Sequence, residues 1–145
     1  MTKDRVIASL QRLAELCRAG QQGYQEAAEH IGDSQLRSYF NDESMERARY
    51  ASELHHALHQ MGVELENEAA APELHRGWEV SGTIPGDDGV LAAVEEGEDV
   101  ARKAYEEALQ EPLPETIEGP VRSQAQAVIA AHDHVKLLRE KKQAA

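Results

Sequence analysis

The sequence predicts an all-α protein, a bundle of four helices, and three observations lead to this prediction. Helix-forming residues dominate a chain in which aromatic residues make up only 4% and prolines number five. Apolar residues recur every three or four positions along four long segments. Two of the links between these segments are short, and the third is long. With 145 residues, the chain is predicted to fold as one domain over residues 1–145.

The first helix is predicted over residues 3–31 and the second over residues 34–61. Between them, "GDS" supplies a glycine stop followed by a new N-cap. The apolar stripe of the first helix consists of Val6, Leu10, Leu13, Cys17, Gly20, Tyr24, Ala27 and Ile31. The stripe of the second helix consists of Leu36, Phe40, Tyr50, Leu54, Leu58 and Met61. Each stripe is long enough to pack along a neighbouring helix over its whole length.

The third helix is predicted over residues 87–110 and the fourth over residues 119–141. Asp87 or Asp88 caps the third helix, and "EPLPETIEGP" breaks the chain before the fourth. The stripe of the third helix consists of Val90, Leu91, Val94, Ala101, Tyr105, Ala108 and Leu109. The fourth helix continues the pattern through Ala125, Val128, His132 and Val135.

The long link, residues 63–86, predicts how the helices are connected. About 24 residues can span roughly 80 Å when extended, whereas a helix of about 27 residues is only about 40 Å long. The link can therefore cross the whole bundle, so that the third helix starts beside the beginning of the second and runs parallel to it. Two antiparallel hairpins joined by one long crossover form the ferritin-like arrangement. Trp78, in the "HRGW" of the crossover, is expected to pin this link onto the bundle.

Charge and composition exclude several classes of partner. The formal net charge is −12, which opposes nucleic-acid binding because phosphates need a basic surface. No run of 18 apolar residues offers a membrane span, and the N-terminal segment is amphipathic, unlike a signal peptide. One cysteine, Cys17, cannot form a disulfide within the chain. We therefore expect a cytoplasmic protein that binds neither nucleic acid nor membrane.

Four stretches of the sequence resemble a known family. They are "GYQEAAEHIGDSQLRSYFNDESMERARYASELHHAL", "HRGW", "EEGEDVARKAYEEAL" and "HDHVKLLRE". Together they resemble a bacterial ferritin-like four-helix-bundle family whose members are largely of unknown function. The resemblance covers nearly the whole chain in the right order and implies the fold. It implies metal binding only through the wider ferritin-like group, since a fold does not determine a function.

Several polar side chains are predicted to face the core. Glu98 lies one turn after Val94, and a buried carboxylate is costly without a partner. We expect Glu98 to face Arg47 and His132, with Glu43 beside Arg47. The predicted buried polar cluster consists of Glu43, Arg47, Glu98, His132, Tyr24, Tyr50 and Tyr105.

A ferritin-like di-iron centre needs a Glu from each of two helices and Glu-x-x-His from the other two. The stripe of the first helix contains no carboxylate, and Ile129 stands three residues before His132. The Glu53-x-x-His56 spacing in "ELHH" is interpreted as accidental, because His56 points away from Leu54. Arg47 adds a permanent positive charge. The sequence therefore predicts no six-ligand di-iron centre.

Two functions remain open at this stage. The first is a non-enzymatic assembly or binding module with a degenerate metal site, without catalytic residues or a firmly assigned cofactor, which forms homo-oligomers through its helix faces. The second is a metal-binding protein with iron-handling, oxidase or peroxide-scavenging activity. For the second, Glu46, Glu98 and His132 are the candidate ligands of one divalent metal, Fe, Mn or Zn.

Overall fold

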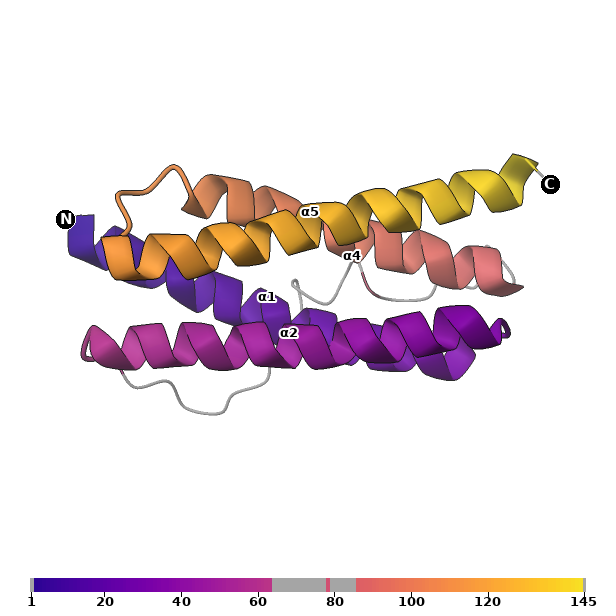
Figure 1. Ribbon diagram of the computed structural model, residues 1–145, viewed down its shortest axis with the longest axis horizontal. Coiled ribbons are helices and arrows are strands. Elements are labelled where there is room, and N and C mark those ends of the chain that lie inside the picture. The colour runs from indigo at the N-terminus through magenta and orange to yellow at the C-terminus, as the bar shows by residue number, and fades with distance from the viewer. Residues whose placement is uncertain (1, 64–77, 79–85, 145) are drawn as a thin grey trace.

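The computed structural model describes residues 2–63, 78 and 86–144, and it confirms an all-α four-helix bundle. The helices are α1 (Thr2–His30), α2 (Ser34–Gln60), α4 (Gly86–Ala108) and α5 (Glu115–Ala144). Figure 1 shows them lying lengthwise beside one another. None of the described helices combines the length and the apolar character that crossing a lipid bilayer requires.

Local capping explains most of the helix boundaries. The Asp33 side chain accepts hydrogen bonds from the backbone N–H groups of Gln35 and Leu36, which fixes the start of α2 as expected. Gly62, with φ +83°, ends it in the left-handed region that favours glycine.

The predicted start of the last helix, at residue 119, is wrong by four residues. The Pro114 carbonyl accepts hydrogen bonds from the N–H groups of Ile117 and Glu118, so the first turn of α5 forms at Glu115. Pro120 therefore lies inside the helix, near its N-terminal end. Pro120 is the sixth residue of α5, so the helix lacks the hydrogen bond that an N–H at this position would donate to the Thr116 carbonyl.

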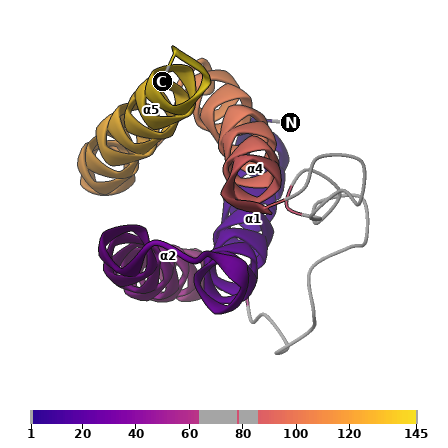
Figure 2. The same ribbon diagram turned by 90° about the vertical axis from the view of Figure 1, so that its right-hand side faces the viewer.

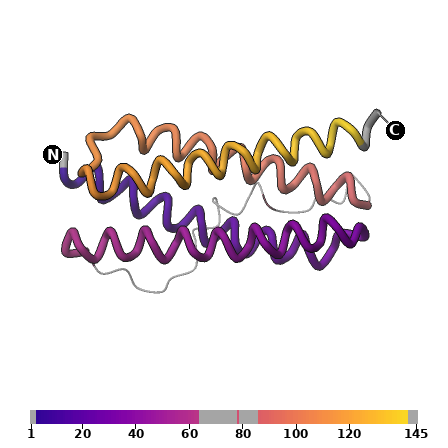
Figure 3. The backbone as a smooth tube through the Cα atoms, in the orientation of Figure 1, coloured from indigo at the N-terminus to yellow at the C-terminus, as the bar shows by residue number. Residues whose placement is uncertain are grey.

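Two contacts define the directions of the helices. The Gly32 N–H, between α1 and α2, donates to Asp87 at the start of α4, at 2.8 Å. At the opposite end, Arg5 of α1 pairs with Glu111, just beyond α4, at 3.0 Å. Consequently α2 and α4 start at the same end and run parallel, as the tube in Figure 3 makes clear. The predicted parallel course of the second and third helices is confirmed.

The bundle is not closed equally on all sides. The helices pack in the order α2, α1, α4, α5, while α2 and α5 touch only sparsely. Seen along its axis in Figure 2, the bundle forms an open arc with α2 and α5 at its two ends. The contacts between α2 and α5 include the rings of Tyr39 and His134, whose centroids are 4.9 Å apart. A groove lies between α2 and α5 on this open side.

Trp78 fixes the crossover to the bundle, as predicted. It is buried and lies against Gly23 of α1 and Gly97 of α4, where an added Cβ would overlap its ring atoms. Its ring centroid is 5.0 Å from that of Tyr24. The two glycines thus form a slot that admits the indole. The other residues of the crossover, 64–77 and 79–85, lie outside the described part of the chain.

Candidate functional site

An ion pair between Arg47 of α2 and Glu98 of α4 occupies the centre of the bundle. Arg47 Nη2 lies 2.6 Å from Glu98 Oε2, and the side chains are 1% and 0% exposed. Burial acts to lower the pKa of the Arg47 guanidinium, but the Glu98 charge, with Tyr24 and Cys17, raises it above its usual value. Arg47 therefore remains a cation. The sequence predicted this contact.

Aromatic rings cover the ion pair on the side of α1. The Arg47 guanidinium carbon lies 5.5 Å from the centroid of the Tyr24 ring, within the range of a cation–π interaction. At Gly20, an added Cβ would lie 3.2 Å from Arg47 Nη1 and 3.5 Å from the Trp78 ring. The indole of the crossover thus lies beside the buried guanidinium and helps to exclude solvent from it.

The ion pair is incompletely satisfied by hydrogen bonds. Arg47 Nε, Glu98 Oε1 and Tyr24 Oη are buried and have no hydrogen-bond partner among the described residues. A buried polar atom without a partner costs roughly 1–3 kcal/mol. The site therefore has one donor, one acceptor and one hydroxyl available to a further polar group.

Glu43 and Tyr50 border the ion pair without bonding to it. Glu43 is half-buried, and burial raises the pKa of its carboxyl, with Glu98 adding to this effect and Arg47 opposing it. Tyr50 packs against Arg49, whose guanidinium carbon is 5.1 Å from the ring centroid. Burial raises the pKa of Tyr50 to about 12. Both residues are neighbours of the pair and not partners in its hydrogen bond.

The structure places His132 away from the ion pair, which differs from the expected cluster. Its Nε2 is 3.7 Å from Asp99 of α4, and its Nδ1 is 3.2 Å from Asp133. It lines a groove of about 550 Å³ between α4 and α5, together with Glu95 and Arg139. The helix α5 packs closely on α4 and hardly on α2. The side of α5 that carries His132 therefore faces the outer side of α4 and not the ion pair.

The three candidate metal ligands are not brought together. Glu46 is half-exposed and pairs with Arg49 at 2.6 Å, Glu98 pairs with Arg47, and His132 lies beside Asp99. Across residues 2–63, 78 and 86–144, no three His, Cys, Asp or Glu side chains are grouped closely enough to hold a metal ion. The donor set of this structure therefore does not fit a metal centre built on these three residues.

Comparison with known families gives one match. Residues 5–111 match the model of a domain of unknown function, DUF2383. The chain belongs to the DUF2383 family. The matched region contains Arg47, Glu98 and Trp78, and it ends before α5 begins. No curated protein matches the chain. The ferritin-like relationship stays a prediction.

A second polar network of this DUF2383 chain runs from the core to the surface. Cys17 Sγ lies 3.1 Å from the Tyr105 hydroxyl, which donates to Gln124 Oε1 at 2.8 Å. Gln124 Nε2 in turn donates to Glu53 at 3.1 Å. Tyr105 thus belongs to this network and not to the Arg47 pair. Burial raises the pKa of the Cys17 thiol to about 11, despite the hydrogen bond with Tyr105.

Sequence reasoning missed this network, although one signal was present. Gln124 occupies a buried position of α5, between Val121 and Val128, and a buried glutamine needs hydrogen-bond partners. Glu53, interpreted from "ELHH" as part of an accidental match, is one of those partners.

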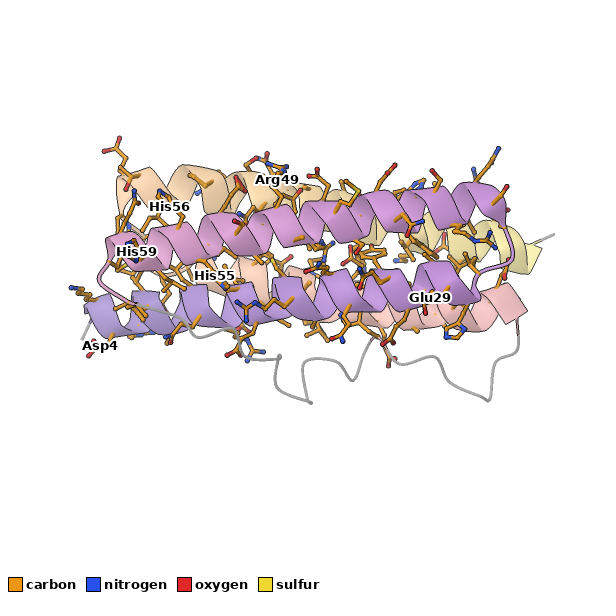
Figure 4. All side chains as sticks on the ribbon, turned by 90° about the horizontal axis from the view of Figure 1, so that it is seen from below. Asp4, Glu29, Arg49, His55, His56 and His59 are labelled. Atoms are coloured by element: carbon orange, nitrogen blue, oxygen red, sulfur yellow. The ribbon has the colours of Figure 1, made fainter. Side chains whose placement is uncertain are left out.

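The DUF2383 chain has a groove of about 450 Å³ between α2 and α5, where the network reaches the surface. Its lining is Ser52, Glu53, Leu54, His56, Ala57 and Gln60 of α2, and Thr116, Ile117, Pro120, Val121 and Gln124 of α5. Figure 4 shows His55 between α1 and α2, whereas Arg49 and His56 lie on the other side of α2. Arg18 of α1 contacts His55, at 2.9 Å from Nε2. The groove is therefore separate from the α1–α2 interface.

Proposed function

We propose that this chain is a cytoplasmic, non-catalytic binding or assembly module with a ferritin-like arrangement, in which the Arg47–Glu98 ion pair takes the place of a metal centre. One observation carries the proposal: Glu98, the one buried carboxylate among the described residues, is bonded to a guanidinium. A carboxylate engaged in this way holds the helices in one register.

Electrostatics supports this interpretation. A guanidinium cannot lose its proton inside a protein. A divalent cation about 5 Å from Arg47 would be repelled by on the order of 6 kcal/mol at an effective dielectric constant near 20. A metal bound at Glu98 therefore requires Arg47 to leave its present position.

The alternative is a metal-binding protein with iron-handling, oxidase or peroxide-scavenging activity. It is favoured by Glu98 Oε1, which has no hydrogen-bond partner among the described residues, and by the half-buried Glu43 carboxyl, whose pKa Glu98 affects. If Arg47 moved away, these two carboxylates would be candidate ligands of one metal. Metal binding by the purified protein therefore has to be measured directly.

Elemental analysis separates the two functions. The protein is purified without a His-tag, as wild type, as Glu98→Gln and as the control Glu106→Gln, whose carboxylate is half-exposed on α4. A structural role for the pair predicts the same low metal content in all three proteins and a lower melting temperature for Glu98→Gln. A stoichiometric metal in the wild type that disappears in Glu98→Gln alone would establish the alternative.

We also propose that copies of the chain associate through the outer faces of α2 and α5. Two large apolar side chains stand out on these helices, Met45 of α2 at 71% exposure and Leu137 of α5 at 50%. Light scattering after size-exclusion chromatography measures the mass of the particle. We expect an oligomer in the wild type and a monomer when both residues are replaced by lysine. A monomeric wild type contradicts this part of the proposal.

A further inference from the structure

We infer that the groove between α2 and α5 binds a small organic cation, a protonated amine on an apolar body. This inference rests on the proposed binding function and names the class of ligand. Three features of the groove carry it: its size, its apolar floor and a carboxylate held in a fixed position on its wall.

The size and the floor suit a small apolar body. The volume, about 450 Å³, lies within the range of about 300–1,000 Å³ that is typical of ligand sites, which often lie between the helices of bundles. The apolar part of the lining is Leu54, Ala57, Ile117, Pro120 and Val121. Because the lining covers only residues 52–60 and 116–124, the groove fits a short chain or ring better than a helix of a partner protein.

The carboxylate is that of Glu53, whose side chain is 42% exposed. Gln124 donates to it at 3.1 Å and is itself held by the Tyr105 hydroxyl at 2.8 Å. Both Gln124 and Tyr105 are buried, so the core fixes the position of Glu53 before any ligand arrives. An oriented carboxylate beside an apolar floor is complementary to an ammonium on an apolar body.

One neighbouring cation, Arg49, lies outside the lining of the groove. Arg49 Nη1 forms an ion pair with Glu53 at 3.7 Å, which is longer than the 2.6 Å ion pair between Arg49 and Glu46. The amide nitrogen of Gln60 lies 3.2 Å from His56 Nε2. Glu53 supplies a carboxylate to this lining, and a carboxylate favours a cation over an anion.

The test is a titration of the full-length chain with three probes of equal length, n-hexylamine, 1-hexanol and hexanoate, followed by backbone amide NMR shifts. We expect hexylamine to move the amide signals of residues 52–60 and 116–124, and to bind about tenfold more tightly than hexanol. Glu53→Gln should weaken hexylamine binding about tenfold. The control Glu118→Gln, which removes a half-exposed carboxylate of α5 outside the groove, should leave it unchanged.

Equal binding of the three probes, no shift at these amides, or unchanged hexylamine affinity in Glu53→Gln would overturn the inference. Ala57→Leu provides a second variant, because it fills the groove while the Glu53 carboxylate is retained, and it should abolish binding. Nα-acetyl-lysine amide forms a further arm: tighter binding than hexylamine would assign the site to a lysine of a partner chain and contradict a small-molecule ligand. If no amine binds, the metal content measured by elemental analysis does not change, so the proposed function is tested independently of this inference.

Discussion

Arg47 and Glu98 join two helices that do not pack closely against each other. Arg47 comes from α2 and Glu98 from α4, the two helices that run parallel, and their side chains meet at 2.6 Å inside the bundle. Since α1 separates these helices in the packing order, the ion pair provides a direct link between the first hairpin and the second. Such a link is expected to set the register of the two hairpins.

The first prediction concerns the energy of this pair. Arg47→Met leaves the Glu98 carboxylate buried without its partner, and we expect it to lower the free energy of unfolding by about 3–5 kcal/mol. The double variant Arg47→Met with Glu98→Leu should recover much of this loss, because no charge then remains buried. Urea unfolding of the two single variants and the double variant measures the coupling.

Arg122→Met serves as the control for this cycle. Arg122 is half-exposed and pairs with Glu118, so its replacement should cost less than about 1 kcal/mol. Equal losses of unfolding free energy for Arg47→Met and Arg122→Met would show that the buried ion pair stabilises the fold no more than a surface ion pair does.

The second prediction concerns the slot that holds Trp78. Trp78→Ala should lower the free energy of unfolding by about 3–5 kcal/mol, as is usual for a buried tryptophan. Gly97→Ala should cost about 1–3 kcal/mol, because its Cβ would overlap the indole. Gly119→Ala is the control: it lies in α5 directly before Pro120, and no atom beyond its chain neighbours and its own helix backbone comes within 4 Å of an added Cβ, so it should change the stability by less than about 1 kcal/mol. Thermal unfolding of the three variants measures these changes in stability. An unchanged stability of Gly97→Ala would contradict the packing of the indole against Gly97.

The third prediction concerns pH. Burial raises the pKa of Glu43 in the folded protein above 4.5, so ionised Glu43 destabilises the fold, and stability falls as pH rises from about 4.5 through the folded pKa. Glu43→Gln should therefore raise the melting temperature at pH 7 and leave it unchanged near pH 4.

Glu46 provides a control of opposite sign. The hydrogen bond from Arg49 lowers the pKa of Glu46 in the folded protein, so its contribution to stability is present above about pH 4.5 and is lost as pH falls through the folded pKa. Glu46→Gln should lower the melting temperature at pH 7. Parallel pH profiles for the two variants would refute the assignment of Glu43 to a half-buried position.

The fourth prediction concerns Cys17. The thiol is buried, and burial raises its pKa to about 11, so little thiolate exists near neutral pH. A disulfide reagent such as DTNB at pH 8 should label the native protein only as fast as it unfolds, and urea should increase the labelling in step with the unfolded fraction. Rapid stoichiometric labelling of the folded protein would be inconsistent with the Cys17–Tyr105 contact.

Local rules predict the helices and the central ion pair well. The stripe of α1 is buried from Val6 to Ile31, and the Asp33 cap is where the sequence places it. The sequence predicts that Arg47 and Glu98 pair, because each lies on an apolar stripe and burying either charge alone is costly. The length of the crossover also predicted the parallel course of α2 and α4.

The features that the sequence did not predict depend on packing between helices. The position of His132 depends on which side of α5 faces α4, and periodicity along one helix does not contain that information. Gln124 and Glu53 become partners only because α2 and α5 approach each other near the groove. The start of α5 lies earlier than the sequence predicts, because the Pro114 carbonyl organises the first turn inside "EPLPETIEGP", a stretch whose prolines and glycine indicate a break.

Reconstitution with Fe²⁺ under anaerobic conditions, followed by exposure to air, tests most directly whether the ion pair takes the place of a metal centre. Two metals need about four carboxylates and two imidazoles, and Glu98 is bound to Arg47 while His132 lies beside Asp99. The ion pair predicts no iron, or one weakly held iron per chain, with no change in absorption on exposure to air. Two tightly bound irons per chain, with the absorption band of an oxo-bridged pair, would contradict it.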